Sequence, residues 1–133
     1  MRAEKVIRTL LLADTGVTAL VAARIYPAQL PQGTALPALI ITHISTIELP
    51  TLDAQAAYSL MRARIEVTAI ASDYATQKNL LEAVRKACNY QRGTIAGVSV
   101  ASVRRDTLGP DLRNDDMQVF TQTLDFFVTY KEE

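Results

Sequence analysis

The sequence predicts an α+β domain with the element order ααββαββ. Three observations carry this prediction. Apolar and polar residues alternate from Met61 to Ala71, apolar residues then recur at helical spacing as far as Cys88, and a second alternation runs from Met117 to Tyr130. We therefore expect an antiparallel four-stranded sheet packed against one main helix and short N-terminal helices.

The chain has the size and composition of one domain, spanning residues 1–133. Of its 133 residues, 49% are apolar and 21% are charged, which suffices for one hydrophobic core. Fourteen basic residues balance fourteen acidic ones, so no overall field attracts nucleic acid or an anionic membrane. Apolar runs are shorter than a membrane span, and the N-terminus shows no signal-peptide pattern.

The first third of the chain predicts two short helices and an extended link. The stripe of apolar residues in the first helix ends at Asp14-Thr15-Gly16, where Thr15 is a candidate cap for the second helix. From Arg24 to Leu36, two prolines and a glycine exclude a regular element.

The next segment, Ala38 to Thr46, predicts a central strand. Its β-branched and apolar residues occupy both alternating faces, which is typical of a strand covered on two sides. Ile47 to Tyr58 contains Pro50 and breaks the alternation, so we expect a long arm between two antiparallel strands.

The strand over Met61 to Ala71 runs directly into the main helix. Ser72 and Asp73 offer N-cap oxygens to its first turn. Its apolar stripe requires burial, and the nearest apolar surface is the odd-numbered face of the preceding strand. The stripe comprises Gln77, Leu80, Leu81, Val84, Ala87 and Cys88.

Two further strands and a polar turn complete the chain. Thr94 to Arg105 reads as a strand in which Gly97 marks a bend, and Asp106 to Asp116 reads as an acidic turn. In the last strand, Gln122 interrupts the apolar row and Phe127 interrupts the polar row.

No reactive constellation is evident. His43 is the single histidine, and its place in an apolar strand favours structural packing over catalysis or metal binding. Cys88 is the single cysteine, which excludes an internal disulfide, favours a reducing compartment, and indicates an inert buried thiol on the helix stripe. Phosphate-binding and nucleophile-elbow motifs are absent. We expect no catalytic, cofactor-binding or metal-binding residues.

Four arginines on two strands form the main charged cluster. Arg62, Arg64, Arg104 and Arg105 are expected to meet on one sheet face. With only 6% aromatic residues and no basic excess, a solvated face or salt bridges to a neighbouring subunit's acidic turn are favoured over nucleic-acid binding.

Several short motifs follow one another in an order that matches one protein family. They are R-I-Y-P at residues 24–27, L-P-Q at 30–32, a strand beginning at Pro37, R-I-E-V at 64–67, Tyr74-Ala75 opening the main helix, and Phe126-Phe127-Val128 near the end. With these motifs, nearly the whole chain resembles the tail completion, or tail terminator, proteins of long-tailed bacteriophages and prophages.

The resemblance implies a non-enzymatic structural protein of phage assembly. It implies a homo-oligomeric ring, typically a hexamer, that caps the tail tube, stops its polymerisation and joins the tail to the head connector. DNA would pass through the ring without sequence-specific binding, and no membrane or cofactor is involved. Assembly would occur in the bacterial cytoplasm and place the protein at the head-proximal end of the virion tail.

Contacts with subunits, tube and connector are expected from the second sheet face, the strand edges, the 47–58 arm and the 106–116 turn. Two alternatives remain open: another head-to-tail adaptor or minor tail protein, and a small ligand-binding or enzymatic domain built around His43. The candidate contact residues are Glu48, Asp53, Tyr58, Arg62, Arg64, Arg104, Arg105, Asp111, Asp115 and Asp116.

Overall fold

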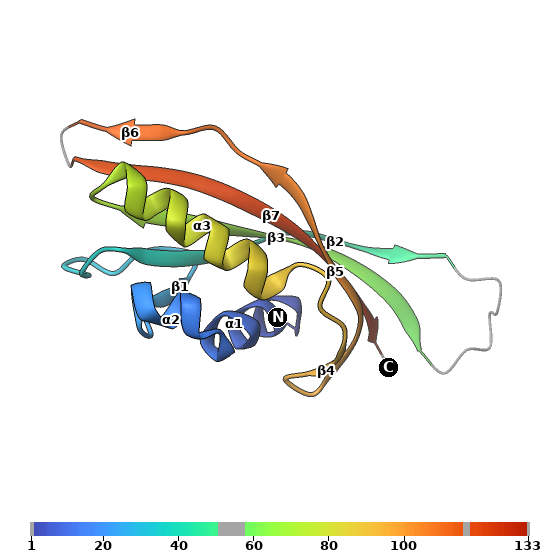
Figure 1. The fold of residues 1–133 in the computed structure, drawn as a ribbon. Coiled ribbons are helices and arrows are strands. Elements are labelled where there is room, and N and C mark those ends of the chain that lie inside the picture. The colour runs from blue at the N-terminus through green and yellow to red at the C-terminus, as the bar shows by residue number, and fades with distance from the viewer. Residues whose placement is uncertain (1, 51–57, 116–117, 133) are drawn as a thin grey trace.

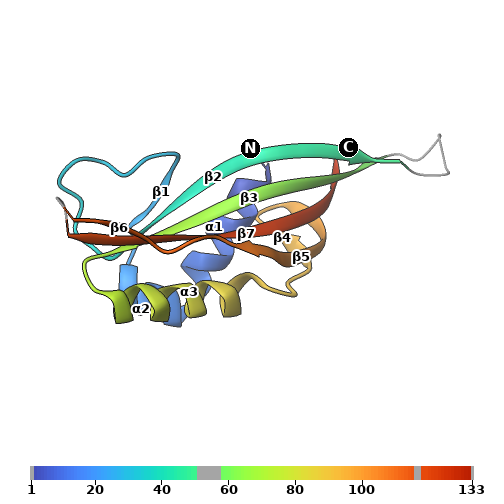
Figure 2. The ribbon, with the colours of Figure 1, turned by 90° about the horizontal axis from the view of Figure 1, so that it is seen from above.

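The computed structural model describes residues 2–50, 58–115 and 118–132. In this part of the chain, three helices lie on one face of a curled seven-stranded sheet (Figures 1 and 2). The elements are α1 (Arg2–Ala13), α2 (Thr15–Val21), β1 (Ile25–Pro27), β2 (Ala38–Leu49), β3 (Ser59–Ala71), α3 (Tyr74–Cys88), β4 (Gly93–Ile95), β5 (Val98–Leu108), β6 (Leu112–Asn114) and β7 (Val119–Glu132).

The sheet is mixed, and it is larger than the sequence predicts. Its order is β1-β2-β3-β7-β5-β4, with β6 pairing to β7 beyond the end of β5. The four long strands β2, β3, β7 and β5 are the expected ones, and neighbouring strands among them are antiparallel. The expectation of a four-stranded, purely antiparallel sheet is therefore wrong, because three short strands join it and β1 runs parallel to β2.

The three additional strands lie where the sequence predicts other structure. β1 occupies Ile25–Pro27, inside the segment for which the sequence predicts no regular element, and that expectation is wrong for these three residues. At the sheet edge a proline costs no ladder hydrogen bond, so Pro27 ends the strand without preventing it. β4 folds back on β5 at Gly97, whose φ of 78° confirms the predicted bend. β6 forms inside the acidic turn.

The strand and helix at the centre of the chain form as predicted. On β3, Ala63, Ile65 and Val67 are fully buried under the helices, and their even-numbered neighbours face the other side. All six residues of the α3 stripe are buried. The Asp73 carboxylate caps α3 by accepting from the Thr76 backbone N–H at 3.0 Å.

The cap of α2 differs from the predicted one. Asp14 Oδ1 accepts from the Val17 backbone N–H at 3.0 Å, and Thr15 is already the first helical residue. Thr15 cannot be the cap because a capping residue must keep a non-helical backbone, as Asp14 does with φ −92° and ψ 122°. In the part of the chain described, no helix has both the length and the apolar character needed to cross a membrane.

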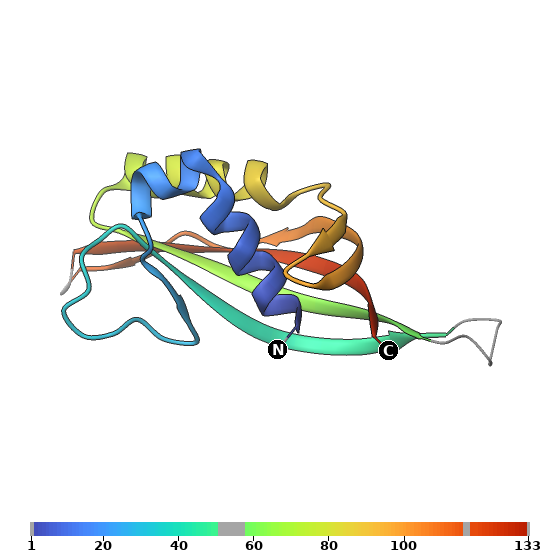
Figure 3. The ribbon, with the colours of Figure 1, turned by 90° about the horizontal axis from the view of Figure 1, so that it is seen from below.

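β2 is not the doubly covered central strand that its composition suggests. Three residues of β1 pair with Leu39–Ile41, and α1 packs on this half of the strand. From His43 to Leu49 the side chains are exposed or half-exposed, because β2 and β3 extend past the helices (Figures 1 and 3). The expectation that His43 is packed in the structure is therefore wrong, because His43 lies on this exposed half of β2.

Candidate interaction surface on the open sheet face

The helices leave one face of the sheet uncovered, and we call it the open face (Figure 2). The even-numbered residues of β3 and the odd-numbered residues of β7 lie on it, because alternate side chains of a strand point to opposite sides. Arg64 and Phe127 are paired across these strands, as are Arg62 and Thr129. Cationic and aromatic side chains are thus brought together at the centre of this face.

Two guanidinium groups converge on the Phe127 ring. The Arg62 Cζ atom lies 4.7 Å from the ring centroid, and the Arg64 Cζ atom lies 6.0 Å from it. Both separations are within the range of cation–π attraction. Phe127, the apparent interruption of the polar row in the sequence, is therefore the platform of the cluster.

Asp125 fixes the orientation of Arg64. Its Oδ2 atom accepts from Arg64 Nε at 2.8 Å and lies 2.6 Å from Nη2, and Asp106 lies 3.5 Å from the same nitrogen. The hydrogen bond to Asp125 raises the pKa of the Arg64 guanidinium above its ordinary value. The carboxylate of Asp125 is buried, although its Oδ1 atom has no hydrogen-bond partner in the described part of the chain.

The structure does not bring all four arginines together. Arg104 is paired with Phe127 across β5 and β7, but its guanidinium lies 5.3 Å from the ring centroid of Tyr90. Arg105 lies on the helix-covered side, because consecutive residues of a strand face opposite ways. The expectation of one four-arginine face is therefore wrong for Arg105.

The acidic turn divides into separate contacts. Asp111 forms an ion pair with Lys78 of α3, and Asp115 pairs with Arg113 at 2.9 Å. Asp106 instead reaches Arg64 on the open face. Asp116 lies outside the described residues.

The predicted arm is partly strand. β2 continues to Leu49 and β3 begins at Ser59, while residues 51–57, which include Asp53, lie outside the described ranges. Glu48 is exposed near the end of β2. Tyr58 is also exposed, with the Lys131 ammonium 4.6 Å from its ring centroid.

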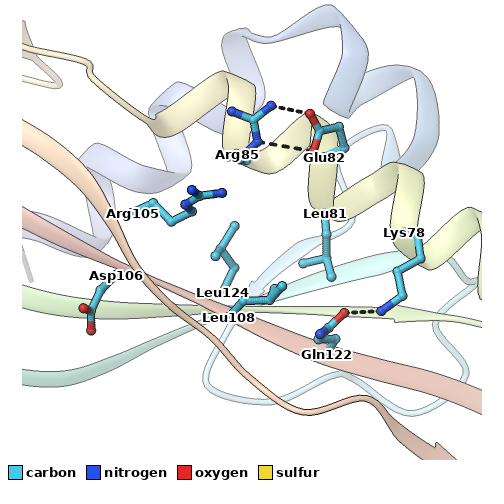
Figure 4. A pocket seen from close by; sticks show the side chains of 9 residues that line it. All are labelled: Lys78, Leu81, Glu82, Arg85, Arg105, Asp106, Leu108, Gln122 and Leu124. Atoms are coloured by element: carbon cyan, nitrogen blue, oxygen red, sulfur yellow. Dashed lines mark hydrogen bonds and ion pairs between the residues drawn. The ribbon is translucent and has the colours of Figure 1, made fainter.

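A groove of about 580 Å³ between α3 and strands β5 and β7 was not predicted (Figure 4). Its residues come from three separate elements, so no single sequence pattern marks it. An ion pair on its rim joins Arg85 to Glu82, and the Arg85 hydrogen bond lowers the pKa of Glu82. The lining consists of Lys78, Leu81, Glu82, Arg85, Arg105, Asp106, Leu108, Gln122 and Leu124.

The single histidine is exposed, and the single cysteine is buried. His43 Nε2 lies 2.6 Å from the Thr46 hydroxyl, on the exposed half of β2. Cys88 is buried, and burial raises the pKa of its thiol, which keeps it protonated and unreactive at neutral pH. Within the described ranges, no three His, Cys, Asp or Glu side chains are placed to hold a metal ion.

Comparisons with known proteins identify the family. The family model described as "Tail completion protein gp17" matches residues 5–131. No match was found among curated proteins. The fold is similar to a solved chain from the structure titled "Virion of native gene transfer agent (GTA) particle", with a TM-score of 0.70 and 19% identity over 96% of this chain and 93% of that chain. The chain therefore belongs to the tail completion protein gp17 family, which makes it a structural protein of the phage tail.

Proposed function

We propose that this protein is the tail terminator of its phage or prophage. Copies of the chain form a ring, with six subunits as the expected number, on the head-proximal end of the tail tube. The ring stops tube polymerisation and joins the tail to the head connector. DNA passes through it without sequence-specific contact.

The open face is the observation that carries this proposal. Two arginines stack on the half-buried Phe127 ring, and a buried oxygen of Asp125 has no hydrogen-bond partner in the described part of the chain, which is a cost to an isolated domain. A protein that docks on this face can supply a donor to Asp125 and cover the Phe127 ring. In a protein of the tail completion family, a subunit, tube or connector protein is the natural occupant.

The distribution of charged side chains supports separate contacts for separate partners. The open face presents Arg62 and Arg64, whereas Asp111 and Asp115 lie at the margin of the sheet, where both are exposed and each forms an ion pair within the chain. A ring subunit requires two different, complementary patches for its neighbours and further surfaces for the structures above and below it. We assign Glu48, Tyr58 and Arg104 to contacts with the structures above and below the ring.

The test uses tails assembled without this protein. If the proposal is correct, such tails are abnormally long and carry no heads, and adding the purified protein during assembly restores both their length and their joining to heads. Length distributions and head attachment are counted by electron microscopy. Binding to the connector without binding to the tube would contradict the terminator role and favour a neck adaptor.

A second measurement addresses the ring directly. Light scattering across a concentration series gives the solution mass, and a stable mass of about six subunits is expected. A strictly monomeric protein that still binds tube ends would mean that the ring assembles on the tail.

A further inference from the structure

We propose that neighbouring copies join edge to edge, so that one sheet continues around the ring. The free edge of β2, residues 42–49, pairs with the free β5–β6 edge, residues 106–113, of the next copy. This inference rests on the proposed ring and names the surface that closes it.

The second half of the β2 edge has no partner strand in the described part of the chain. β1 covers it at Leu39–Ile41, and no strand in the described part of the chain pairs with the outer side beyond that point. Glu48 is the single charged residue on the free stretch, which contains no lysine or proline. Free strand edges normally carry charged residues, prolines or bulges, and this stretch has two such features, Glu48 and the bulge between His43 and Ser45.

The opposite margin of the sheet offers the second edge. β4 pairs with β5 near its beginning, and the Asn89 side chain accepts from the backbone N–H of Arg105. Beyond Arg105, no described strand pairs with the outer side of β5 or of β6. The two free edges are thus different in sequence and lie on opposite margins, as a head-to-tail contact requires (Figure 1).

Strand direction is compatible with this pairing. β2, β3, β7 and β6 alternate in direction across the sheet, since each neighbouring pair is antiparallel. The β2 of a following copy, placed beside β6 in the same orientation, therefore continues the alternation and forms an antiparallel ladder.

Exposed aliphatic side chains match across the two edges. Ile47 on β2 is 47% exposed and Leu112 on β6 is 58% exposed. Ile47 is paired with Arg62 and Leu112 with Thr121, and both of these residues lie on the open face. A continuous sheet keeps each face on one side, so only side chains on the same face can meet across the joint, and these two satisfy that condition.

The two free edges are offset along the strand direction. Leu112 aligns, through Thr121 and Ile70, with Ala38 rather than with the free half of β2. Placing Leu112 opposite Ile47 therefore shifts each copy by about nine residues, or ~30 Å, relative to its neighbour.

The test blocks each edge separately. The variants Ile47→Lys and Leu112→Lys each place a charge at one side of the joint, and Ala19→Lys, at an exposed position on α2, is the matched control. Each edge variant should weaken self-association by about 100-fold or more, whereas the control should assemble like the wild type. Circular dichroism and thermal melting confirm that all three variants fold.

Mixing the variants tests the head-to-tail arrangement. Each edge variant alone should be monomeric, and an equimolar mixture should form a one-to-one heterodimer and nothing larger, because one intact joint remains. If either variant alone still forms rings like those of the wild type, the edge-to-edge inference is wrong, but the proposed ring itself is not contradicted. If the wild-type protein is monomeric in solution, the same variants are added to tail tubes, and formation of complete rings on tube ends by either edge variant alone would overturn the inference.

Discussion

The two faces of the sheet are formed by the same strands but serve different purposes. On β7, Phe126 points into the helix-covered core and is fully buried, while Phe127 points to the open face beneath Arg62 and Arg64. The covered face excludes water by packing within the chain. The open face pairs charge with aromatic surface and is only half-buried, which is expected of a surface that a second protein completes. Variants that affect folding and variants that affect assembly should therefore separate by face.

The largest expected effect distinguishes the adjacent phenylalanines. Phe126→Ala opens a cavity in the core and should lower the free energy of unfolding by about 3–5 kcal/mol. Phe127→Ala should cost about 1–2 kcal/mol, since the half-buried ring loses two cation–π contacts of about 0.5–1 kcal/mol each. Urea denaturation measures both values.

In tail assembly, Phe127→Ala should have an effect much larger than its effect on stability. Phe127→Ala should remain folded but fail to restore length and head joining to terminator-free tails. If Phe127→Ala supports tail completion at the wild-type level, the open face is not an assembly surface.

Cys88 tests how tightly the covered face is closed. Burial raises the pKa of its thiol in the folded state above that in the unfolded chain, which is about 8.5. Below this pH the thiol is neutral in both states, and its contribution to stability is fully present. Above that pH the unfolded chain loses its proton first, so stability should fall by up to about 1.4 kcal/mol per pH unit. Denaturation at pH 8 and pH 10 measures the decline.

Cys88→Ala is the control for this pH dependence. It should remove the alkaline decline attributable to the thiol, at the expense of a small loss of packing. In the wild type, a thiol reagent should modify the protein only as fast as it unfolds. Rapid modification of the native protein at pH 8 would show that α3 does not seal this position.

Asp125 should have an intermediate effect because it is buried but belongs to the open face. Asp125→Asn keeps the shape of the side chain but removes the charge that holds Arg64, and it should cost about 1–2 kcal/mol of stability. Thermal melting at constant pH measures the change. Thr123→Val, on the same face of β7, is a control that leaves the ion pair intact, and an equal loss in both variants would argue against a specific role for the carboxylate.

The covered face could be predicted from the sequence, but much of the open face could not. The alternation over residues 61–71 and the apolar stripe of α3 each lie within one short stretch of the chain. They can therefore be detected in the sequence, and they define β3, α3 and the core between them. β1, β4 and β6 have three residues each, too few to show a period, and depend on the long strands to which they pair. Their existence follows from tertiary contacts that the pattern does not contain.

The arginine cluster shows the same division. Arg62 and Arg64 are two residues apart on one strand, so their shared face could be predicted. Arg104 and Arg105 are consecutive, and the strand period already places them on opposite sides. Predicting that Arg64 lies beside Phe127 requires the register between β3 and β7, which the sequence alone does not determine. The one signal in the sequence is that Phe127 is an aromatic residue within the polar row of β7.

The smallest expected effect on stability comes from Arg62, and it gives the sharpest separation of folding from assembly. Its guanidinium stacks on Phe127 at a half-exposed position, where a cation–π contact is worth about 0.5–1 kcal/mol. Arg62→Gln should therefore lower stability by no more than this amount, and thermal melting should barely detect it. If the open face docks on a partner, the same variant should reduce tail completion far more than it reduces stability, and Arg62→Lys should restore only part of it, because an ammonium lacks the planar group that stacks on the ring. Full activity of Arg62→Gln would instead mean that the guanidinium only covers Phe127 within the subunit, and the contact surface would then have to lie at the strand edges.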